Sequence, residues 1–140
     1  MIAPVTYMLD TNMVSYILKG KSIRARQHLE DVTGENEVCI SAITEAEIRY
    51  GLAKRPMRIE VREEIERFLK TIEIEVWDSE AAFQYGELRA SLEAKGKMLA
   101  NMDMLIAAHA AAIGAVLVTN DKAFEHTEGM FATVNWADDL

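Results

Sequence analysis

Short, largely apolar runs constrain the fold of this chain more than any other feature. Four of them stand out, at residues 5–9, 37–41, 74–77 and 115–119. Each is apolar over most of its length rather than alternating with polar residues, which indicates strands that are buried on both faces. Because such strands belong to a parallel sheet covered by helices on both sides, we predict a three-layer α/β/α fold with about four to five short strands.

The stretches between these runs have the apolar spacing of helices. Helices are predicted at residues 13–18, 22–31, 44–54, 59–72, 79–95 and 102–113. Pro56 should end the third helix, Ser79 should cap the fifth, and Gly114 should end the last. With 140 residues and no repeat or linker, the chain is expected to be a single domain covering residues 1–140.

The charge distribution limits how a polyanion could approach. The chain carries 15 Lys+Arg and 23 Asp+Glu, a net charge of −8, which argues against a protein that coats nucleic acid through a basic surface. Residues 1–70 nevertheless contain 11 basic and 11 acidic residues, whereas residues 71–140 contain 4 and 12. We therefore expect any polyanion to approach the first half of the chain or to be bridged by cations.

The single cysteine and the absence of long apolar windows favour a location in the reducing cytoplasm. Cys39 lies in an apolar run, so neither an intramolecular disulfide nor a cysteine-based metal site can form. The amino terminus has no basic segment followed by an apolar stretch, and no window approaches the ~20 apolar residues of a membrane span. A cytoplasmic protein without membrane association is expected.

Acidic residues follow the predicted strands. Asp10 and Asp121 come after the first and last strands, and Glu47 lies about one helical turn after the second. Since ligands of open parallel sheets bind beyond the carboxyl ends of the strands, these three acids should share one edge. Asp103 begins the helix that feeds the last strand. Strand topology alone led us to expect it at the opposite edge unless that helix protrudes.

Gathered carboxylates repel one another, and their repulsion is tolerated mainly when a cation is bound. Oxygen ligands select a hard ion such as Mg²⁺ or Mn²⁺, which suits substrates that bring phosphate oxygens. Such an ion can activate water and stabilise the charge that develops during displacement at a phosphodiester.

Each acid also has a purely structural interpretation. Thr44 and Glu47 match a capping box, Asp103 could stabilise a helix N-terminus, and Asp10 and Asp121 could form turns. His109 lies on an apolar helix face without a second histidine or a cysteine partner, so we interpret it as a structural histidine with satisfied hydrogen bonds rather than a metal ligand.

Four motifs together resemble the PIN-domain ribonucleases and, more narrowly, the VapC-type toxins of bacterial toxin–antitoxin pairs. They are Met8-Leu9-Asp10-Thr11-Asn12, the segment from Ser41 to Gly51 that contains Glu47, Asp103-Met104-Leu105-Ile106-Ala107-Ala108-His109-Ala110, and Val118-Thr119-Asn120-Asp121. Their order and spacing cover almost the whole chain, which makes the set far more specific than any one motif.

The resemblance implies an acidic pocket for Mg²⁺ or Mn²⁺ built from all four acids, with Asp10 and Asp103 as metal ligands. It implies that the helix carrying Asp103 turns its N-terminal end toward this pocket. Asn12 and Thr119 match accessory positions that orient the acids or a water. Glu47 and Asp121 would complete the catalytic set.

The resemblance also implies partners. These are an RNA substrate, plausibly transfer or ribosomal RNA, a second copy of the chain in a homodimer, and a small VapB-like antitoxin that blocks the acidic groove, for instance with an arginine. Cations that could guide RNA by phosphate contacts are Lys19, Lys21, Arg24, Arg26, Arg49, Lys54 and Arg55.

Two other functions remain open on sequence grounds. A strand that ends in Asp10 also suits an aspartyl-phosphate phosphatase, although that chemistry favours an acid where Asn12 stands. The fold could instead serve as a catalytically silent module that binds RNA or protein. Four retained acids argue against that second alternative, because a silent site has no reason to keep their mutual repulsion.

Overall fold

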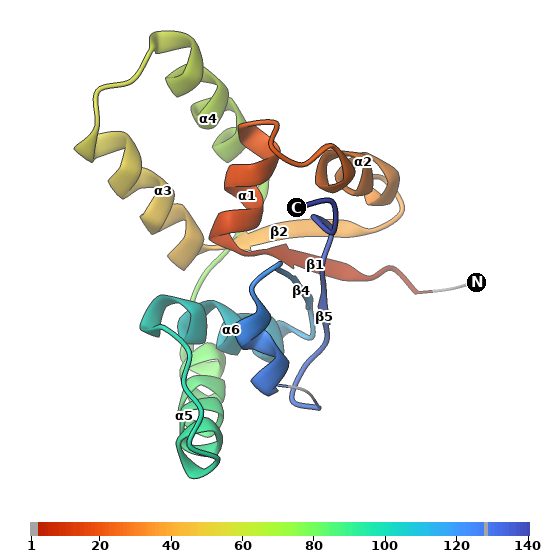
Figure 1. Ribbon diagram of the computed structural model, residues 1–140, viewed down its shortest axis with the longest axis vertical. Helices are drawn as coiled ribbons and strands as arrows, with labels where there is room; N and C mark the ends of the chain where they lie inside the picture. Colours follow the sequence, from red (N-terminus) through yellow and green to blue (C-terminus); the bar gives the residue numbers. More distant parts are fainter. Residues whose placement is uncertain (1–2, 128) are drawn as a thin grey trace.

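A single parallel sheet organises the protein (Figure 1). The computed structural model describes residues 3–127 and 129–140, and within them the sheet has the order β3-β2-β1-β4-β5. Every neighbouring pair is parallel, which confirms the predicted α/β class. The strands are β1 (Thr6–Leu9), β2 (Glu37–Ser41), β3 (Glu73–Glu75), β4 (Val116–Val118) and β5 (Thr133–Val134).

Helices connect the strands at nearly the predicted places. They are α1 (Thr11–Leu18), α2 (Ile23–Val32), α3 (Ala42–Lys54), α4 (Ile59–Thr71), α5 (Ser79–Ala94) and α6 (Asn101–Ile113), followed by a 3-10 helix, η1 (Lys122–Thr127). Gly114 ends α6 with a left-handed φ of 69°, as the sequence predicts. The prediction that Ser79 caps α5 is wrong, because the side chain of Asp78 accepts the hydrogen bond from the Ala81 amide.

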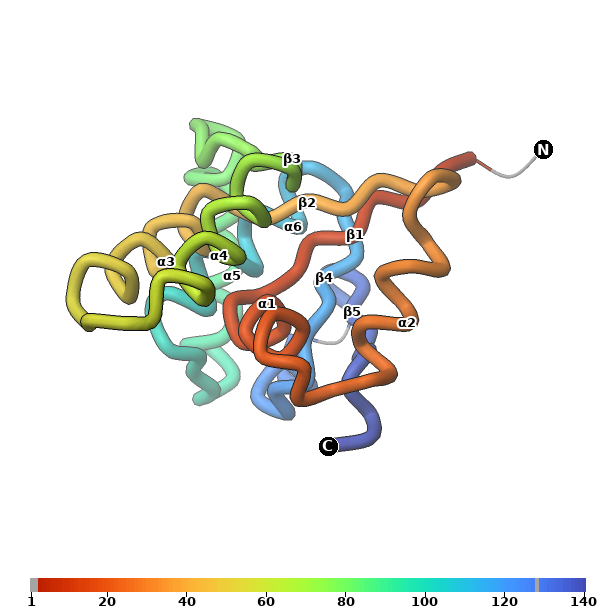
Figure 2. Tube along the Cα trace, turned by 90° about the horizontal axis from the view of Figure 1, so that it is seen from above, coloured from red at the N-terminus to blue at the C-terminus, as the bar shows by residue number. Residues whose placement is uncertain are grey.

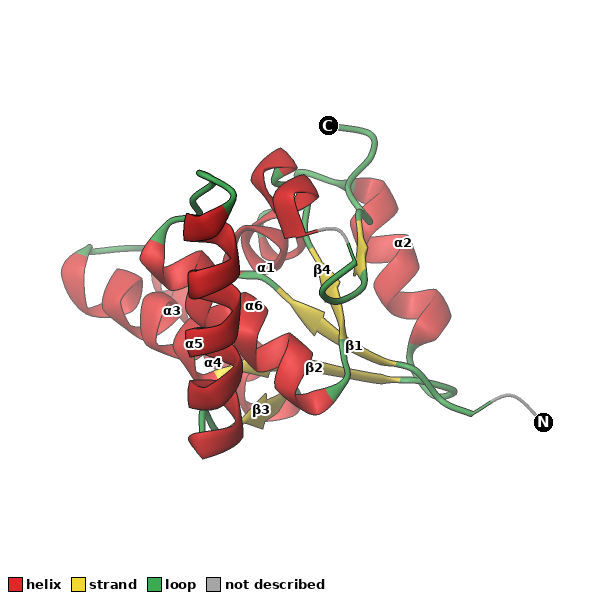
Figure 3. Cartoon of the chain, turned by 90° about the horizontal axis from the view of Figure 1, so that it is seen from below, coloured by secondary structure: helices red, strands yellow, loops and turns green. Residues whose placement is uncertain are grey.

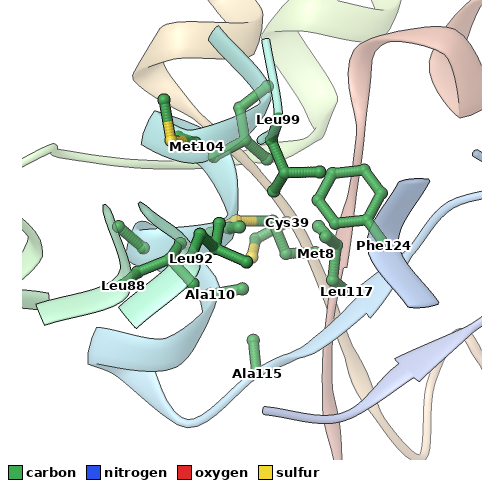
Figure 4. Packing of buried hydrophobic residues seen from close by; sticks show 13 residues of the cluster. Met8, Cys39, Leu88, Leu92, Leu99, Met104, Ala110, Ala115, Leu117 and Phe124 are labelled. Atoms are coloured by element: carbon green, nitrogen blue, oxygen red, sulfur yellow. The ribbon is translucent and has the colours of Figure 1, made fainter. Parts of the chain in front are cut away.

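Consecutive residues of the central strands face opposite layers. Met8 of β1 packs in a core with α5 and α6, whereas Leu9 packs in a second core with α1, α2 and α4. Figure 4 shows the first core, in which Met8 and Leu117 lie beneath the side chains of α5, α6 and η1. This division explains the continuously apolar strands, because each strand must satisfy two apolar layers.

The helix pair α5 and α6 forms one covering layer. These two helices pack against each other and lie on the same side of the sheet, away from α1 and α2 (Figures 1 and 3). Seen from above, α1 lies over the middle of the sheet, beside the carboxyl ends of β1 and β4 (Figure 2). The arrangement is the three-layer architecture that the sequence predicts.

The helix α3 touches both layers. Near its start Ile43 packs against the core of α5 and α6, and further along Ile48 and Leu52 pack in the core of α1, α2 and α4. Only Thr44 and Leu52 of this helix are fully buried. Apolar packing therefore holds α3 less firmly than it holds α6, most of whose middle is buried.

Two sequence interpretations of burial can be checked directly. Cys39 is buried at 1 % exposure, and burial, together with the charges of nearby glutamates, raises the pKa of its thiol to about 12. This supports a structural cysteine. Among residues 3–127 and 129–140 the structure has no helix long and apolar enough to cross a membrane.

Candidate active site

The sheet reverses its direction of growth between β1 and β4. The chain adds β2 and β3 on one side of β1 and then crosses to place β4 on the other side. Open α/β sheets bind ligands in the crevice beyond the carboxyl ends of the strands at such a point. Asp10 follows β1 and Thr119 follows β4, and the amide of Asp10 donates to the carbonyl of Val118 at 3.0 Å.

Asp10 occupies a buried position at this crevice. It is 4 % exposed and caps α1, with its Oδ1 accepting from the amide of Met13 at 2.8 Å. Burial, together with the negative charges of Asp103 and Asp121, raises the pKa of Asp10 to about 6, although hydrogen bonds from Thr119 and Met13 oppose the rise. The turn interpretation and the active-site interpretation are therefore compatible at this residue.

Asp103 lies in the first turn of α6 and belongs to the same cluster. Its pKa is raised by burial and by the negative charges of Asp121 and Glu47. The topological expectation that Asp103 lies at the opposite edge is wrong. A helix that feeds a parallel strand runs back antiparallel to it, so α6 ends beside the start of β4 and begins at the carboxyl edge.

Glu47 is held by a residue of α1 rather than by its own helix terminus. The hydroxyl of Thr11 lies 2.6 Å from Glu47 Oε1 and 3.2 Å from the hydroxyl of Thr44. The capping-box interpretation is wrong, because Ser41 is the N-cap of α3 and accepts from the amide of Ile43 at 3.0 Å. Glu47 is thereby free to face the other acids.

Asp121 combines a turn with a place in the cluster. Its Oδ1 accepts from the amide of Ala123 at 2.9 Å, which starts η1. Its own amide donates to the hydroxyl of Thr119 at 3.1 Å, so Thr119 links Asp121 to Asp10. Asn12, the second accessory position, is exposed in the first turn of α1.

The donor set fits a hydrated hard cation. Among the described residues no group of three or more His, Cys, Asp or Glu side chains is close enough to hold an ion directly. Mg²⁺ requires less than this, because it keeps several waters and is commonly bound by one or two carboxylates plus phosphate oxygens of the substrate. A buried Asp10 with a raised pKa and nearby acids supplies the negative field that such an ion neutralises.

Some features of the site were missed or only half recognised by sequence reasoning. Thr11 was counted only as part of a motif, and nothing in its spacing reveals that it donates to Glu47. His109 is fully buried, as a structural histidine should be, and burial lowers its pKa. Its Nδ1 lies 2.7 Å from Ser41 Oγ, and a backbone hydrogen bond to Val76 opposes the fall in its pKa.

Two of the cations that could guide RNA are engaged in ion pairs. Arg24 Nε lies 2.6 Å from Asp138, and Arg49 Nη1 lies 3.0 Å from Glu66. These pairs are on the surface and leave both arginines about half exposed. Lys54 instead lies over the ring of Tyr50, with its Nζ 5.3 Å from the ring centre.

Comparison with known proteins agrees with this architecture. The family model of the PIN domain matches residues 7–130. The switch-point acids and the all-parallel sheet thus define a protein of the PIN-domain family, to which this chain belongs.

Relatives of nearly full length narrow the class to VapC. Ribonuclease VapC2 of Rickettsia felis is 37% identical over 131 residues, covering 93% of this chain and 97% of its own. The tRNA(fMet)-specific endonuclease VapC of Shigella flexneri is 34% identical over 134 residues, covering 94% and 98%.

Solved structures lead to the same group. The VapBC2 complex of Rickettsia felis, bound to a DNA fragment from its promoter, matches with a TM-score of 0.86 and 36% identity over 94% of this chain and 99% of that one. DNA-bound VapBC from Salmonella typhimurium matches with a TM-score of 0.84 and 33% identity over 94% and 98%. The protein is therefore a VapC-type member of its family.

Proposed function

We propose that this protein is a metal-dependent endoribonuclease, the toxin of a toxin–antitoxin pair, which hydrolyses phosphodiester bonds of RNA and so inhibits translation. The observation that carries the proposal is the meeting of four acids from four separate segments at one crevice. Burial and the charges of two neighbours raise the pKa of Asp10 to about 6, so the cluster is costly without a cation. A single nuclease domain over residues 1–140, acting in the cytoplasm, is part of the same proposal.

The acids divide the work by their burial and contacts. Asp10 and Asp103 are proposed to hold Mg²⁺ or Mn²⁺, since each is buried or half-buried and each has a raised pKa. Glu47 and Asp121 would orient the attacking water, with Glu47 aimed by the hydroxyl of Thr11. Bound at this site, a divalent ion supplies charge neutralisation at the phosphate and lowers the pKa of water.

Thr119 and Asn12 support this arrangement. The hydroxyl of Thr119 accepts from the amide of Asp121 and donates to Asp10, so it restrains two acids at once. Asn12 is exposed in the first turn of α1, two residues after Asp10, where its amide is accessible to substrate or water. Both are positioning roles, because neither side chain carries charge.

Transfer RNA is the first substrate to test, because one relative with 34% identity is named a tRNA(fMet)-specific endonuclease. Ribosomal RNA remains the second candidate. Single-stranded loops of either RNA expose bases and phosphates to a crevice of this kind. Cations of the first half of the chain supply phosphate contacts without sequence preference.

An antitoxin partner is proposed for the groove that leads away from the acids. The groove has a volume of about 380 Å³ between α1, α3 and α4, and Thr11 lies at its active-site end. Apolar side chains form its floor, and the charged side chains around it are three basic residues and one acidic residue, Glu64. The floor includes Val14, Leu18, Ile48, Leu52, Met57 and Ile65, and the rim carries Lys19, Lys54 and Arg55.

Such a groove suits an amphipathic segment with apolar anchors and acidic flanks. Two of the matching solved structures are DNA-bound VapBC complexes, which supports a VapB-like occupant here. An arginine of that partner could then reach the acid cluster and neutralise it. We also propose a homodimer as the working assembly.

The decisive experiment incubates antitoxin-free protein with purified transfer RNA and with ribosomal RNA in Mg²⁺ or Mn²⁺. Wild-type protein should cleave, whereas Asp10→Asn and a chelator should each abolish cleavage. Persistence of cleavage in both controls would exclude the proposed mechanism. Tight RNA binding without cleavage would support a silent module, and phosphate release from small phosphomonoesters would support a phosphatase.

A further inference from the structure

A buried polar contact joins α6 to the start of α3. His109 of α6 and Ser41 of β2 are both 0 % exposed, and His109 Nδ1 lies 2.7 Å from Ser41 Oγ. An imidazole in an apolar core costs free energy unless its polar atoms are paired. Its Nδ1 is paired with Ser41, and a backbone hydrogen bond to Val76 also acts on the ring. The contact with Ser41 is therefore one of the polar bonds that allow this imidazole to be buried.

The direction of this hydrogen bond follows from the other bond of Ser41. Ser41 Oγ already accepts from the amide of Ile43 at 3.0 Å, as the N-cap of α3. Its hydroxyl proton still needs an acceptor, and Nδ1 is the acceptor in contact. Ser41 therefore donates to Nδ1, and His109 is the neutral tautomer with its proton on Nε2. The lowered pKa of His109, caused mainly by burial, agrees with a neutral ring.

Ser41 and His109 are each separated by the same number of residues in sequence from one acid of the cluster. Ser41 precedes Glu47 by six residues, and Asp103 precedes His109 by six residues. Six residues correspond to about 9 Å along a helix, so the contact ties the two acid-bearing helices close to the site. A second polar contact reaches α3 from α1, where Thr11 bonds to Glu47.

Apolar packing alone leaves α3 weakly located. Its fully buried residues are Thr44 and Leu52, and Thr44 makes a polar contact with the hydroxyl of Thr11. The first turn of α3 is thus held to α6 by the partly buried side chain of Ile43 and by the polar contact of Ser41 with His109. A loss of this contact would let the helix shift without opening a large apolar surface.

We propose that His109 is a positioning residue that sets the separation of Glu47 and Asp103 through Ser41. The inference rests on the proposed function, because it concerns the same acid cluster. His109 touches neither the acids nor the space between them. Its action is to hold the N-terminus of α3 against α6, so that Glu47 would be in place to orient water beside an ion held by Asp103.

Three substitutions separate a polar role from a packing role. Asn places a polar atom near the position of Nδ1, Gln places one near Nε2, and Leu fills the space without a polar atom. In His109→Asn the side-chain amide oxygen can still accept from the Ser41 hydroxyl. In His109→Gln the longer side chain carries its amide past the Ser41 hydroxyl. The proposal predicts that Mn²⁺ affinity and cleavage rate are higher in His109→Asn than in His109→Gln or His109→Leu.

In the first measurement, each protein is titrated with Mn²⁺ alone and the heat of binding is recorded by calorimetry. Loss of a group that orients metal ligands commonly lowers metal affinity about 10–100-fold, so His109→Leu should bind Mn²⁺ at least about tenfold more weakly. His109→Asn should recover most of the affinity. The second measurement is the rate of RNA cleavage, in which kcat should fall in His109→Leu while KM changes little.

Unfolding in urea supplies the contrasting measurement. A purely structural histidine predicts that Leu, the better core residue, matches or exceeds Asn in both stability and Mn²⁺ affinity. The proposal predicts opposite rankings, with Leu the more stable and Asn the better metal binder. Leu92→Ala is the matched control, because Leu92 lies in the core that packs against α6 but has no polar atom that could bond Ser41, and it should leave Mn²⁺ affinity within about twofold.

Ser41→Gly tests the other end of the contact. Glycine is an acceptable N-cap, so this variant removes the hydroxyl while largely keeping the helix start. Ser41→Gly should weaken Mn²⁺ binding as His109→Leu does. The variant with both substitutions should bind Mn²⁺ about as tightly as the weaker-binding single variant, because the two residues act through one contact. If His109→Asn fails to fold, unchanged Mn²⁺ affinity in Ser41→Gly overturns the proposal.

The outcomes also separate this inference from the proposed function. Wild-type protein that binds Mn²⁺ but cleaves no RNA would refute the ribonuclease proposal and leave the positioning role to be decided by the titrations. Cleavage by wild-type protein together with equal Mn²⁺ affinity and kcat in His109→Asn and His109→Leu would refute the positioning role alone.

Discussion

Replacing Asp10 by Asn should make the metal-free protein more stable at neutral pH while removing its activity. The pKa of Asp10 moves from the ordinary 3.8 to about 6 on folding, mainly because the carboxylate loses its hydration. One pKa unit corresponds to about 1.4 kcal/mol, so the ionised side chain costs the folded state up to about 3 kcal/mol. Asn removes this charge.

The contacts of Asp10 survive the change. The amide oxygen of Asn can cap α1 as the carboxylate does, by accepting from the amide of Met13. The amide nitrogen can donate to the hydroxyl oxygen of Thr119, which has a second lone pair beside the one used by the Asp121 amide, while the Thr119 hydroxyl gives up its own donation to Asp10. The expected net effect is therefore close to the electrostatic one.

The pH dependence fixes the origin of the effect. A raised carboxyl pKa means that the folded state binds more protons than the unfolded state between pH 3.8 and about 6. The cost of Asp10 is absent below this window, grows through it and is complete above it. The stability gain of Asp10→Asn should accordingly be full at pH 7 and disappear near pH 4.

Urea unfolding at pH 7 and pH 4, without divalent ions, measures the difference, with thermal unfolding as a second method. At roughly 3 °C per kcal/mol for a chain of this size, a gain of 2–3 kcal/mol corresponds to roughly 6–9 °C. Asp31→Asn, an exposed position on α2, should change stability by less than about 0.5 kcal/mol. A gain that persists at pH 4, or none at pH 7, would refute the electrostatic reasoning.

Three further predictions follow from individual contacts. Thr11→Val should lower the cleavage rate about tenfold or more by removing the hydrogen bond to Glu47, while Thr11→Ser should retain most of it. Ser22→Ala should destabilise the protein by about 1–2 kcal/mol in urea, because this buried hydroxyl caps α2 and donates to a carboxylate near the chain terminus. Asp103→Asn should lower the pKa of Asp10, because it removes a neighbouring negative charge. The pKa is measured from the carboxyl resonance of Asp10 in an NMR titration, and an unchanged pKa would contradict the electrostatic contact between the two acids.

The parts of the fold that depend on apolar pattern were accessible from the sequence. β2 spans the predicted residues 37–41, and α6 ends at Gly114 because only a left-handed residue fits there. The two-residue strand β5 and the short helix η1 were not predicted. Neither has enough length for a periodic signal, and β5 is defined by its pairing with β4.

The site was accessible only in part. Asp10 and Asp121 follow strands, so the edge rule located them, and Thr44 misled because its spacing to Glu47 imitates a capping box. The error at Asp103 arose from applying that rule to a helix without reversing its direction. The contact of Thr11 with Glu47 spans 36 residues of sequence, and that of His109 with Ser41 spans 68. No local sequence pattern encodes such pairs.

The pairing of β1 with β4 has a consequence for how the molecule folds. This pairing brings residues near 9 and 118 together, and closing so long a loop is slow compared with forming helices or local turns. Asp10 and Asp121 meet only after it is made. A chain that has folded its first half alone therefore carries helices and a partial sheet but no complete acid cluster, so nuclease activity should appear in one step with the final long-range contact.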